Sequence, residues 1–69
     1  MEFREKAKLR IEHWMKHSNA HVNEYSEFAD ELDNYGYIDA ARNIREMATI
    51  TAKCSHYLIN ALQSVNDAS

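Results

Sequence analysis

The only glycine of the chain, Gly36, lies almost at the centre of its 69 residues, and the sequence contains no proline. Most of the residues on either side of it favour helices, so the glycine is the one strong helix breaker. A glycine just after the last helical turn can adopt the left-handed backbone conformation that ends a helix. We therefore expect a helix over about residues 2–34, a turn at about 35–37 and a helix over about 38–65.

A turn of two or three residues makes consecutive helices antiparallel. The fold class predicted from the sequence is therefore all-α, an antiparallel two-helix hairpin. A chain of 69 residues is too short for a second hydrophobic core, so residues 1–69 are expected to form one domain.

Apolar residues of the first predicted helix recur every seven positions, as in helices that pack lengthwise. One row consists of Ile11, Ser18, Tyr25 and Leu32, and a second of Ala7, Trp14, His21, Phe28 and Tyr35, with Met15, Val22 and Ala29 widening the stripe. The inward row of the second helix consists of Ala41, Ile44, Ala48, Thr51, Ser55, Leu58, Leu62 and Val65. A turn centred near Gly36 to Tyr37 brings residues whose numbers sum to about 73–76 opposite each other. This register predicts that Phe28 packs against Ala48. It also predicts that Glu31 comes near Arg45 and that Asp33 comes near Arg42.

Two helices bury only one face each, so several apolar side chains are expected to remain partly uncovered. Met15, Val22, Ile50, Tyr57 and Ile59 are examples. Leftover apolar surface of this kind is typical of hairpins that associate. We expect a homodimer that forms a four-helix bundle, or docking onto a partner helix.

The net charge of −3 is unevenly distributed along the chain. Residues 1–17 carry five basic and three acidic side chains, whereas residues 18–36 carry five acidic side chains and no basic one. A short basic end without interleaved exposed aromatic residues argues against nucleic-acid binding. The sequence has no apolar stretch long enough to span a membrane, and its single cysteine, Cys54, cannot form a disulfide within one chain. We therefore expect a cytoplasmic protein that binds neither membranes nor nucleic acid.

Three histidines follow one another at four-residue spacing in the first predicted helix, and neighbours at this spacing lie on one helix face. A metal site is therefore one interpretation, with His13, His17, His21, Glu24 and Cys54 as candidate ligands. Histidine and cysteine with a carboxylate would suit zinc, nickel or copper.

The alternative interpretation is structural. His21 would then be a packing residue satisfied by a nearby hydroxyl group, and Cys54 a small apolar residue. No catalytic residue is predicted, because a Cys54–His21 pair would lack an orienting third group and an oxyanion hole. A non-enzymatic binding or interaction module is therefore the expected function, with transition-metal binding as the alternative.

Two stretches of the chain carry a resemblance to a known family. They are His13-Trp14-x-x-His17-Ser18-x-x-His21-x-x-Glu24-Tyr25 and Gly36-x-x-x-Ala40-Ala41-x-x-Ile44. Over about residues 9–65 the chain resembles a small family of prokaryotic helical-hairpin domains of unknown function. Ser18 stands where that family has asparagine, and Cys54 and His56 are not part of its pattern. The resemblance implies a helical hairpin from a bacterium or archaeon, and it implies no activity.

Overall fold

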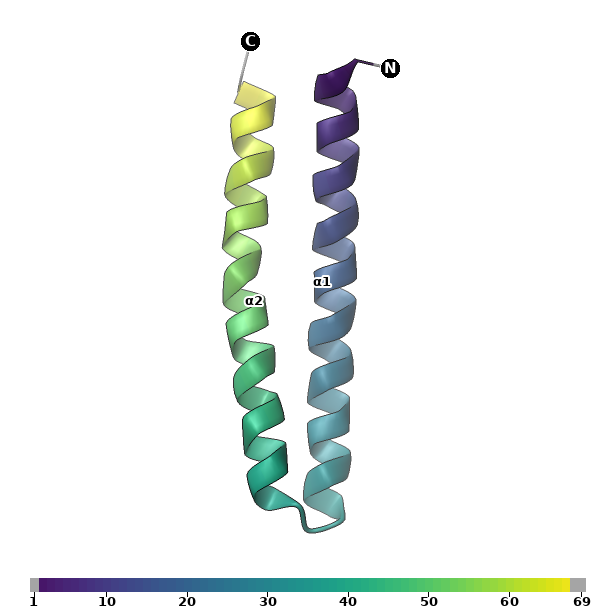
Figure 1. The fold of residues 1–69 in the computed structure, drawn as a ribbon, viewed down its shortest axis with the longest axis vertical. Helices are drawn as coiled ribbons and strands as arrows, with labels where there is room; N and C mark the ends of the chain where they lie inside the picture. Colours follow the sequence, from purple (N-terminus) through teal and green to yellow (C-terminus); the bar gives the residue numbers. More distant parts are fainter. Residues whose placement is uncertain (1, 68–69) are drawn as a thin grey trace.

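The computed structural model describes residues 2–67, which form two long antiparallel helices joined by a tight turn (Figure 1). Helix α1 spans Phe3–Asn34 and helix α2 spans Ile38–Asp67. The first turn of α1 and the last turn of α2 lie side by side at the end opposite the turn that joins the helices (Figure 1). The predicted all-α hairpin is therefore confirmed. Neither helix within residues 2–67 has the length and apolar character needed to cross a membrane.

Helix α2 extends two residues beyond its predicted end near Val65. Val65 is half-buried against α1, and the guanidinium group of Arg4 donates a hydrogen bond to the backbone carbonyl of Asn66. These tertiary contacts hold the last turn, which its own sequence would leave free to fray.

The turn has the hydrogen-bond pattern of a Schellman motif. Gly36 has a φ angle of +89°, in the left-handed region that glycine adopts without strain. Its amide donates to the carbonyl of Asp33 at 3.0 Å, and the amide of Tyr37 donates to the carbonyl of Leu32 at 2.8 Å. These two bonds satisfy carbonyl groups that the end of α1 would otherwise leave unpaired. The expected role of Gly36 is thus confirmed.

The interhelical seam has alanine at its most buried positions. Ala29 of α1 and Ala41 of α2 have no exposed surface, and Ala48 of α2 is 5% exposed. The remaining seam residues are half-buried, namely Ile11, Met15, Ser18, Val22, Tyr25 and Leu32 of α1 and Ile44, Thr51, Ser55, Leu58, Leu62 and Val65 of α2. The inward row predicted for the second helix is therefore confirmed.

The first row predicted for α1 is confirmed, whereas the second is wrong for its three large aromatic residues; Ala7 and His21 of that row are half-buried. Trp14 is 49% exposed and Phe28 is 51% exposed, and Tyr35 is more exposed still. The row of Met15, Val22 and Ala29 takes their place in the seam. Alanine opposite alanine allows the helices to approach closely, whereas the larger rings fit only at the edge of such a contact.

One ion-pair cluster links the two helices near the turn. The guanidinium group of Arg45 lies 2.8 Å from a carboxylate oxygen of Asp30 and 2.6 Å from one of Asp33. The hydrogen bonds that Arg45 donates to the carboxylates of Asp30 and Asp33 raise the pKa of Arg45 above its usual value. Acidic residues near the end of α1 do meet Arg45 as predicted, but they are Asp30 and Asp33, whereas Glu31 was expected beside Arg45 and Asp33 beside Arg42. Arg42 pairs within its own helix with Asp39, at 3.1 Å.

Candidate functional site

The two sides of the hairpin that flank the seam differ in chemistry. Asp33 and Arg45, which form an ion pair on one side, each directly follow a seam residue. Trp14, Phe28 and Met47 each directly precede a seam residue, and so lie on the opposite side. The large apolar residues exposed on that side are Phe3, Trp14 and Phe28 of α1 and Met47, Ile50 and Tyr57 of α2, which we call the aromatic face.

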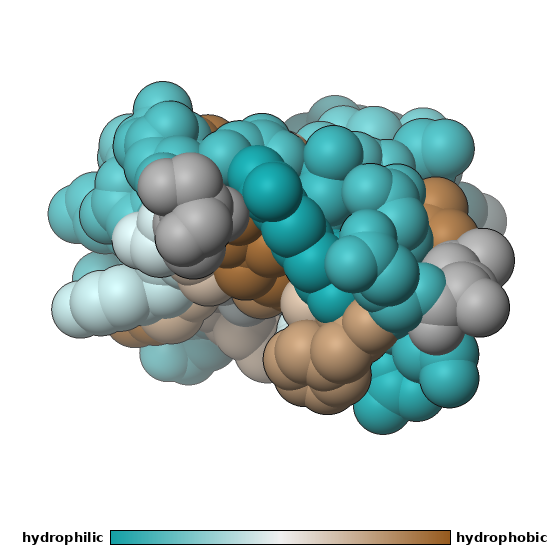
Figure 2. All heavy atoms as spheres, turned by 90° about the horizontal axis from the view of Figure 1, so that it is seen from above, coloured by the Kyte–Doolittle hydropathy of each residue, from teal (hydrophilic) through white to brown (hydrophobic). Residues whose placement is uncertain are grey.

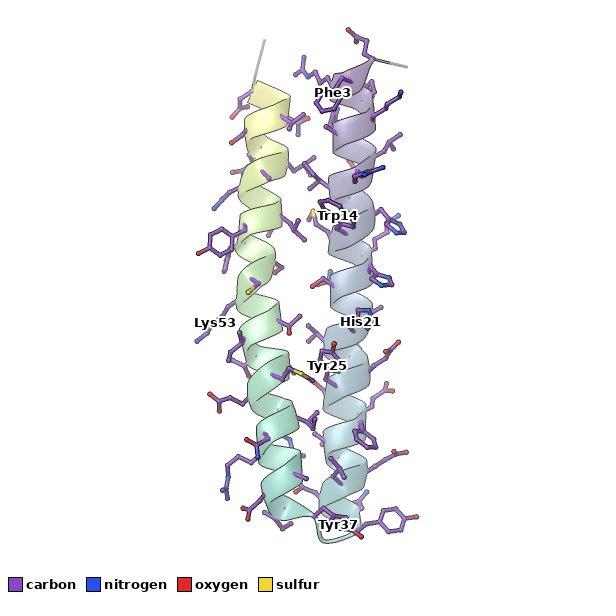
Figure 3. The ribbon with its side chains drawn as sticks, viewed as in Figure 1. Phe3, Trp14, His21, Tyr25, Tyr37 and Lys53 are labelled. Atoms are coloured by element: carbon purple, nitrogen blue, oxygen red, sulfur yellow. The ribbon has the colours of Figure 1, made fainter. Side chains whose placement is uncertain are left out.

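The aromatic face holds most of the large apolar residues that flank the seam, whereas Leu9, Ile38 and Ile59 are exposed on the other side. Viewed from the open end, hydrophobic residues come to the surface along the lower side, and the upper side is mostly hydrophilic (Figure 2). Trp14 and His21 lie along α1 (Figure 3), with Phe28 one heptad further on. Sequence reasoning placed Trp14 and Phe28 in the core of the hairpin, and so did not identify them as surface residues. The sequence signal that could have identified them is Ala29, the residue next to Phe28. Its small side chain allows α2 to approach α1 more closely than the ring of Phe28 would.

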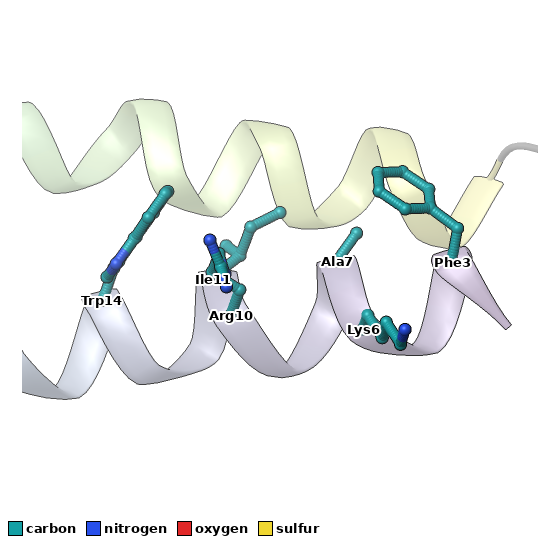
Figure 4. Close-up of a pocket in the computed structure, with 6 residues that line it drawn as sticks. All are labelled: Phe3, Lys6, Ala7, Arg10, Ile11 and Trp14. Atoms are coloured by element: carbon teal, nitrogen blue, oxygen red, sulfur yellow. The ribbon is translucent and has the colours of Figure 1, made fainter. Parts of the chain in front are cut away.

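A shallow groove lies at the open end of the aromatic face (Figure 4). Its lining comes from α1 alone, and consists of Phe3, Lys6, Ala7, Arg10, Ile11 and Trp14. The groove borders the C-terminal part of α2 (Figure 4). It combines an apolar floor with two cationic side chains, an arrangement suited to a helix that presents apolar and acidic residues.

The three histidines of α1 form a continuous ridge beside the aromatic face. The rings of His13 and His17 are stacked with centroids 5.9 Å apart, and those of His17 and His21 meet edge-on at 4.4 Å. The Nε2 atoms of His17 and His21 are 3.0 Å apart, so one ring donates a hydrogen bond to the other. A carboxylate oxygen of Glu24 lies 3.4 Å from Nδ1 of His21, whose ring also stacks on Tyr25.

The predicted metal ligands are only partly brought together by the fold. Among residues 2–67, no group of three or more histidine, cysteine, aspartate or glutamate side chains has the geometry of a metal site. His17 and His21 converge through their Nε2 atoms, and Glu24 approaches the other nitrogen of His21. Cys54 is exposed on α2. The metal site with His13, His17, His21, Glu24 and Cys54 as ligands stays a prediction.

Comparison with known proteins identifies the family of this chain. No curated protein and no solved structure matches it. A family model described as a domain of unknown function, DUF8180, matches residues 7–65, which include most of both helices, the turn and the histidine ridge. The match agrees with the expectation of an uncharacterised family. The chain belongs to the DUF8180 family of domains of unknown function.

Proposed function

We propose that this domain is a non-enzymatic self-association module whose aromatic face pairs with the aromatic face of a second copy, forming a four-helix bundle. The observation that carries the proposal is the exposure of Trp14, Phe28, Met47 and Ile50 on one side of a hairpin. A soluble monomer rarely leaves a row of large apolar side chains uncovered, and rows of this kind usually mark an interface.

The accessible surface of the hairpin supports a dimer. Its 5501 Å² exceeds by about 1,000 Å² the value of about 4,500 Å² expected for a compact monomer of 8.1 kDa. Its radius of gyration is 16.0 Å, against about 11 Å for a compact domain of this length. A stable interface buries about 800 Å² on each partner. The excess surface is therefore of the size that one such interface would cover.

Charge supports a particular orientation of the two copies. The turn half of the hairpin, residues 18–53, carries seven acidic and three basic side chains, whereas the open half carries five basic and four acidic ones. Two copies with their turns at the same end would place two acidic halves together. Copies with their turns at opposite ends place each acidic half beside a basic one, which favours association. In this arrangement each α1 runs antiparallel to the α1 of the other copy.

The groove at the open end supports the same arrangement. When the two α1 helices overlap fully, Arg10 of one copy lies beside the segment of the other that contains Glu24, Glu27 and Phe28. The groove that Arg10 and Lys6 border thus meets acidic and aromatic side chains. The apolar and ionic features of α1 are in this way complementary to those of its own symmetry mate.

The test compares two substitutions at equally exposed apolar positions. Phe28 is 51% exposed on the aromatic face, and Leu9 is 53% exposed on the opposite side, at the heptad position of Asp30. About 100 Å² of each Phe28 side chain is accessible to solvent in the single hairpin. A dimer would bury about 200 Å² from the two Phe28 side chains, which contributes up to 5 kcal/mol to the free energy of association. Alanine retains part of this area, so Phe28→Ala should cost about 3 kcal/mol per dimer, or roughly a hundredfold in the dissociation constant.

Sedimentation equilibrium measures the dissociation constant, and Trp14, the only tryptophan, provides a second signal. Its emission should move to shorter wavelength as concentration rises, because a half-exposed ring becomes buried. Leu9→Ala should leave both measurements unchanged. A chain that remains monomeric at millimolar concentration, or equal effects of Phe28→Ala and Leu9→Ala, would refute self-association through this face and leave a different partner helix as its ligand.

A further inference from the structure

We infer that the dimer contains a transition-metal site on its twofold axis, in which His17 and His21 of each copy supply four imidazole nitrogens to one ion. The inference rests on the proposed self-association, because it places ligands from two chains around one metal. It assigns the histidine ridge a role that neither hairpin can perform alone, since one chain gathers only two of the required ligands.

The separation of the two ring nitrogens within one chain fits shared coordination. The Nε2 atoms of His17 and His21 are 3.0 Å apart. Two nitrogens bonded to one ion at about 2.0–2.1 Å are about 2.8 to 3.4 Å apart for bond angles between 90° and the tetrahedral value. The spacing of the pair therefore matches shared coordination, and both rings would turn so that their Nε2 lone pairs point at one ion.

Glu24 supports the orientation of His21 that this site requires. Its carboxylate lies 3.4 Å from Nδ1 of the ring, on the side opposite Nε2. A carboxylate that accepts the Nδ1 proton leaves the Nε2 lone pair free for a metal, and this is the usual partner of a metal-binding histidine. Glu24 is thus assigned as a positioning residue. This differs from the direct ligand role that spacing alone suggested.

The symmetry of the dimer brings the two histidine pairs together. With turns at opposite ends, the twofold axis runs perpendicular to the helices and passes between the two α1 helices near the middle of the Phe3–Asn34 span. That middle lies at residues 18–19, between His17 and His21. Full overlap therefore places His17 of one copy opposite His21 of the other. Four imidazole ligands suit zinc, copper or nickel, and zinc prefers a tetrahedral set.

Zinc titration of the full chain, followed by calorimetry and sedimentation, tests the site. We expect one zinc ion for every two chains and a lower dimer dissociation constant with zinc than with chelator. His17→Ala should abolish zinc binding, and because His17 lies at the dimer axis, sedimentation with chelator measures its effect on the metal-free dimer separately. His21→Asn should also abolish zinc binding, and Glu24→Gln should weaken zinc affinity about 10- to 100-fold.

Two substitutions are matched controls for other ligand sets. His13→Ala and Cys54→Ser should retain both the affinity and the stoichiometry of zinc binding, because neither residue lies in the converging pair. A dimer that binds no zinc would overturn the metal site and leave self-association standing. One zinc ion per monomeric chain, or loss of binding in Cys54→Ser, would also overturn it. A chain that stays monomeric with and without zinc would refute the proposed function itself.

Discussion

Substitution of Gly36 isolates the contribution of one backbone conformation to the hairpin. The residue has a φ angle of +89°, and a Cβ atom built there would meet no atom within 4 Å. Gly36→Ala therefore introduces no steric overlap, and its cost is the conformational strain of an L-residue in the left-handed region, about 1–2 kcal/mol. Alanine also reduces the entropy of the unfolded chain, which offsets about 0.4–1 kcal/mol. The expected net loss is about 1 kcal/mol per chain.

Thermal unfolding followed by circular dichroism at fixed protein concentration measures this loss. For a domain of this size, 1 kcal/mol corresponds to a decrease in Tm of roughly 4–8 °C. Gly36→Asn should lose less, because asparagine tolerates the left-handed region better than alanine does. Unchanged or higher stability of Gly36→Ala would show that the turn does not depend on a left-handed residue. A loss above about 3 kcal/mol would show that glycine also has a packing role, contrary to the open space around it.

Two further predictions concern the seam and the orientation of the dimer. Ala48→Leu should destabilise the hairpin by about 1–3 kcal/mol in chemical unfolding, because a larger side chain overfills a site that is only 5% exposed. Ala52→Leu, at an exposed position, is its control. Equal effects of the two substitutions would show that the seam is not tightly packed. Added salt should weaken the dimer in sedimentation experiments, because it screens attraction between acidic and basic halves placed together. Tighter association at high salt would instead indicate that the two acidic turn halves lie at the same end.

Local sequence features determined the hairpin, the inward row of α2 and the first of the two rows predicted for α1. The helices and the turn follow from good helix formers, one central glycine and the absence of proline, all of which act within a few residues. The inner row of α2 was also predictable, because its alanine, isoleucine and leucine positions have polar neighbours on one side. The closeness of His17, His21 and Glu24 follows from helical spacing alone.

Tertiary structure decided which row of α1 enters the seam and which becomes surface. The rows of Phe28 and Ala29 flank the same central row, and hydrophobicity alone favours the aromatic one. The small residues Ala41 and Ala48 on α2 reverse that preference. Two helices that meet along small residues approach closely and make more van der Waals contacts than two helices held apart by large rings. Side-chain geometry then brought the Nε2 atoms of His17 and His21 together. Sequence spacing determines which side chains are neighbours on a helix, and packing between helices determines which of them remain exposed.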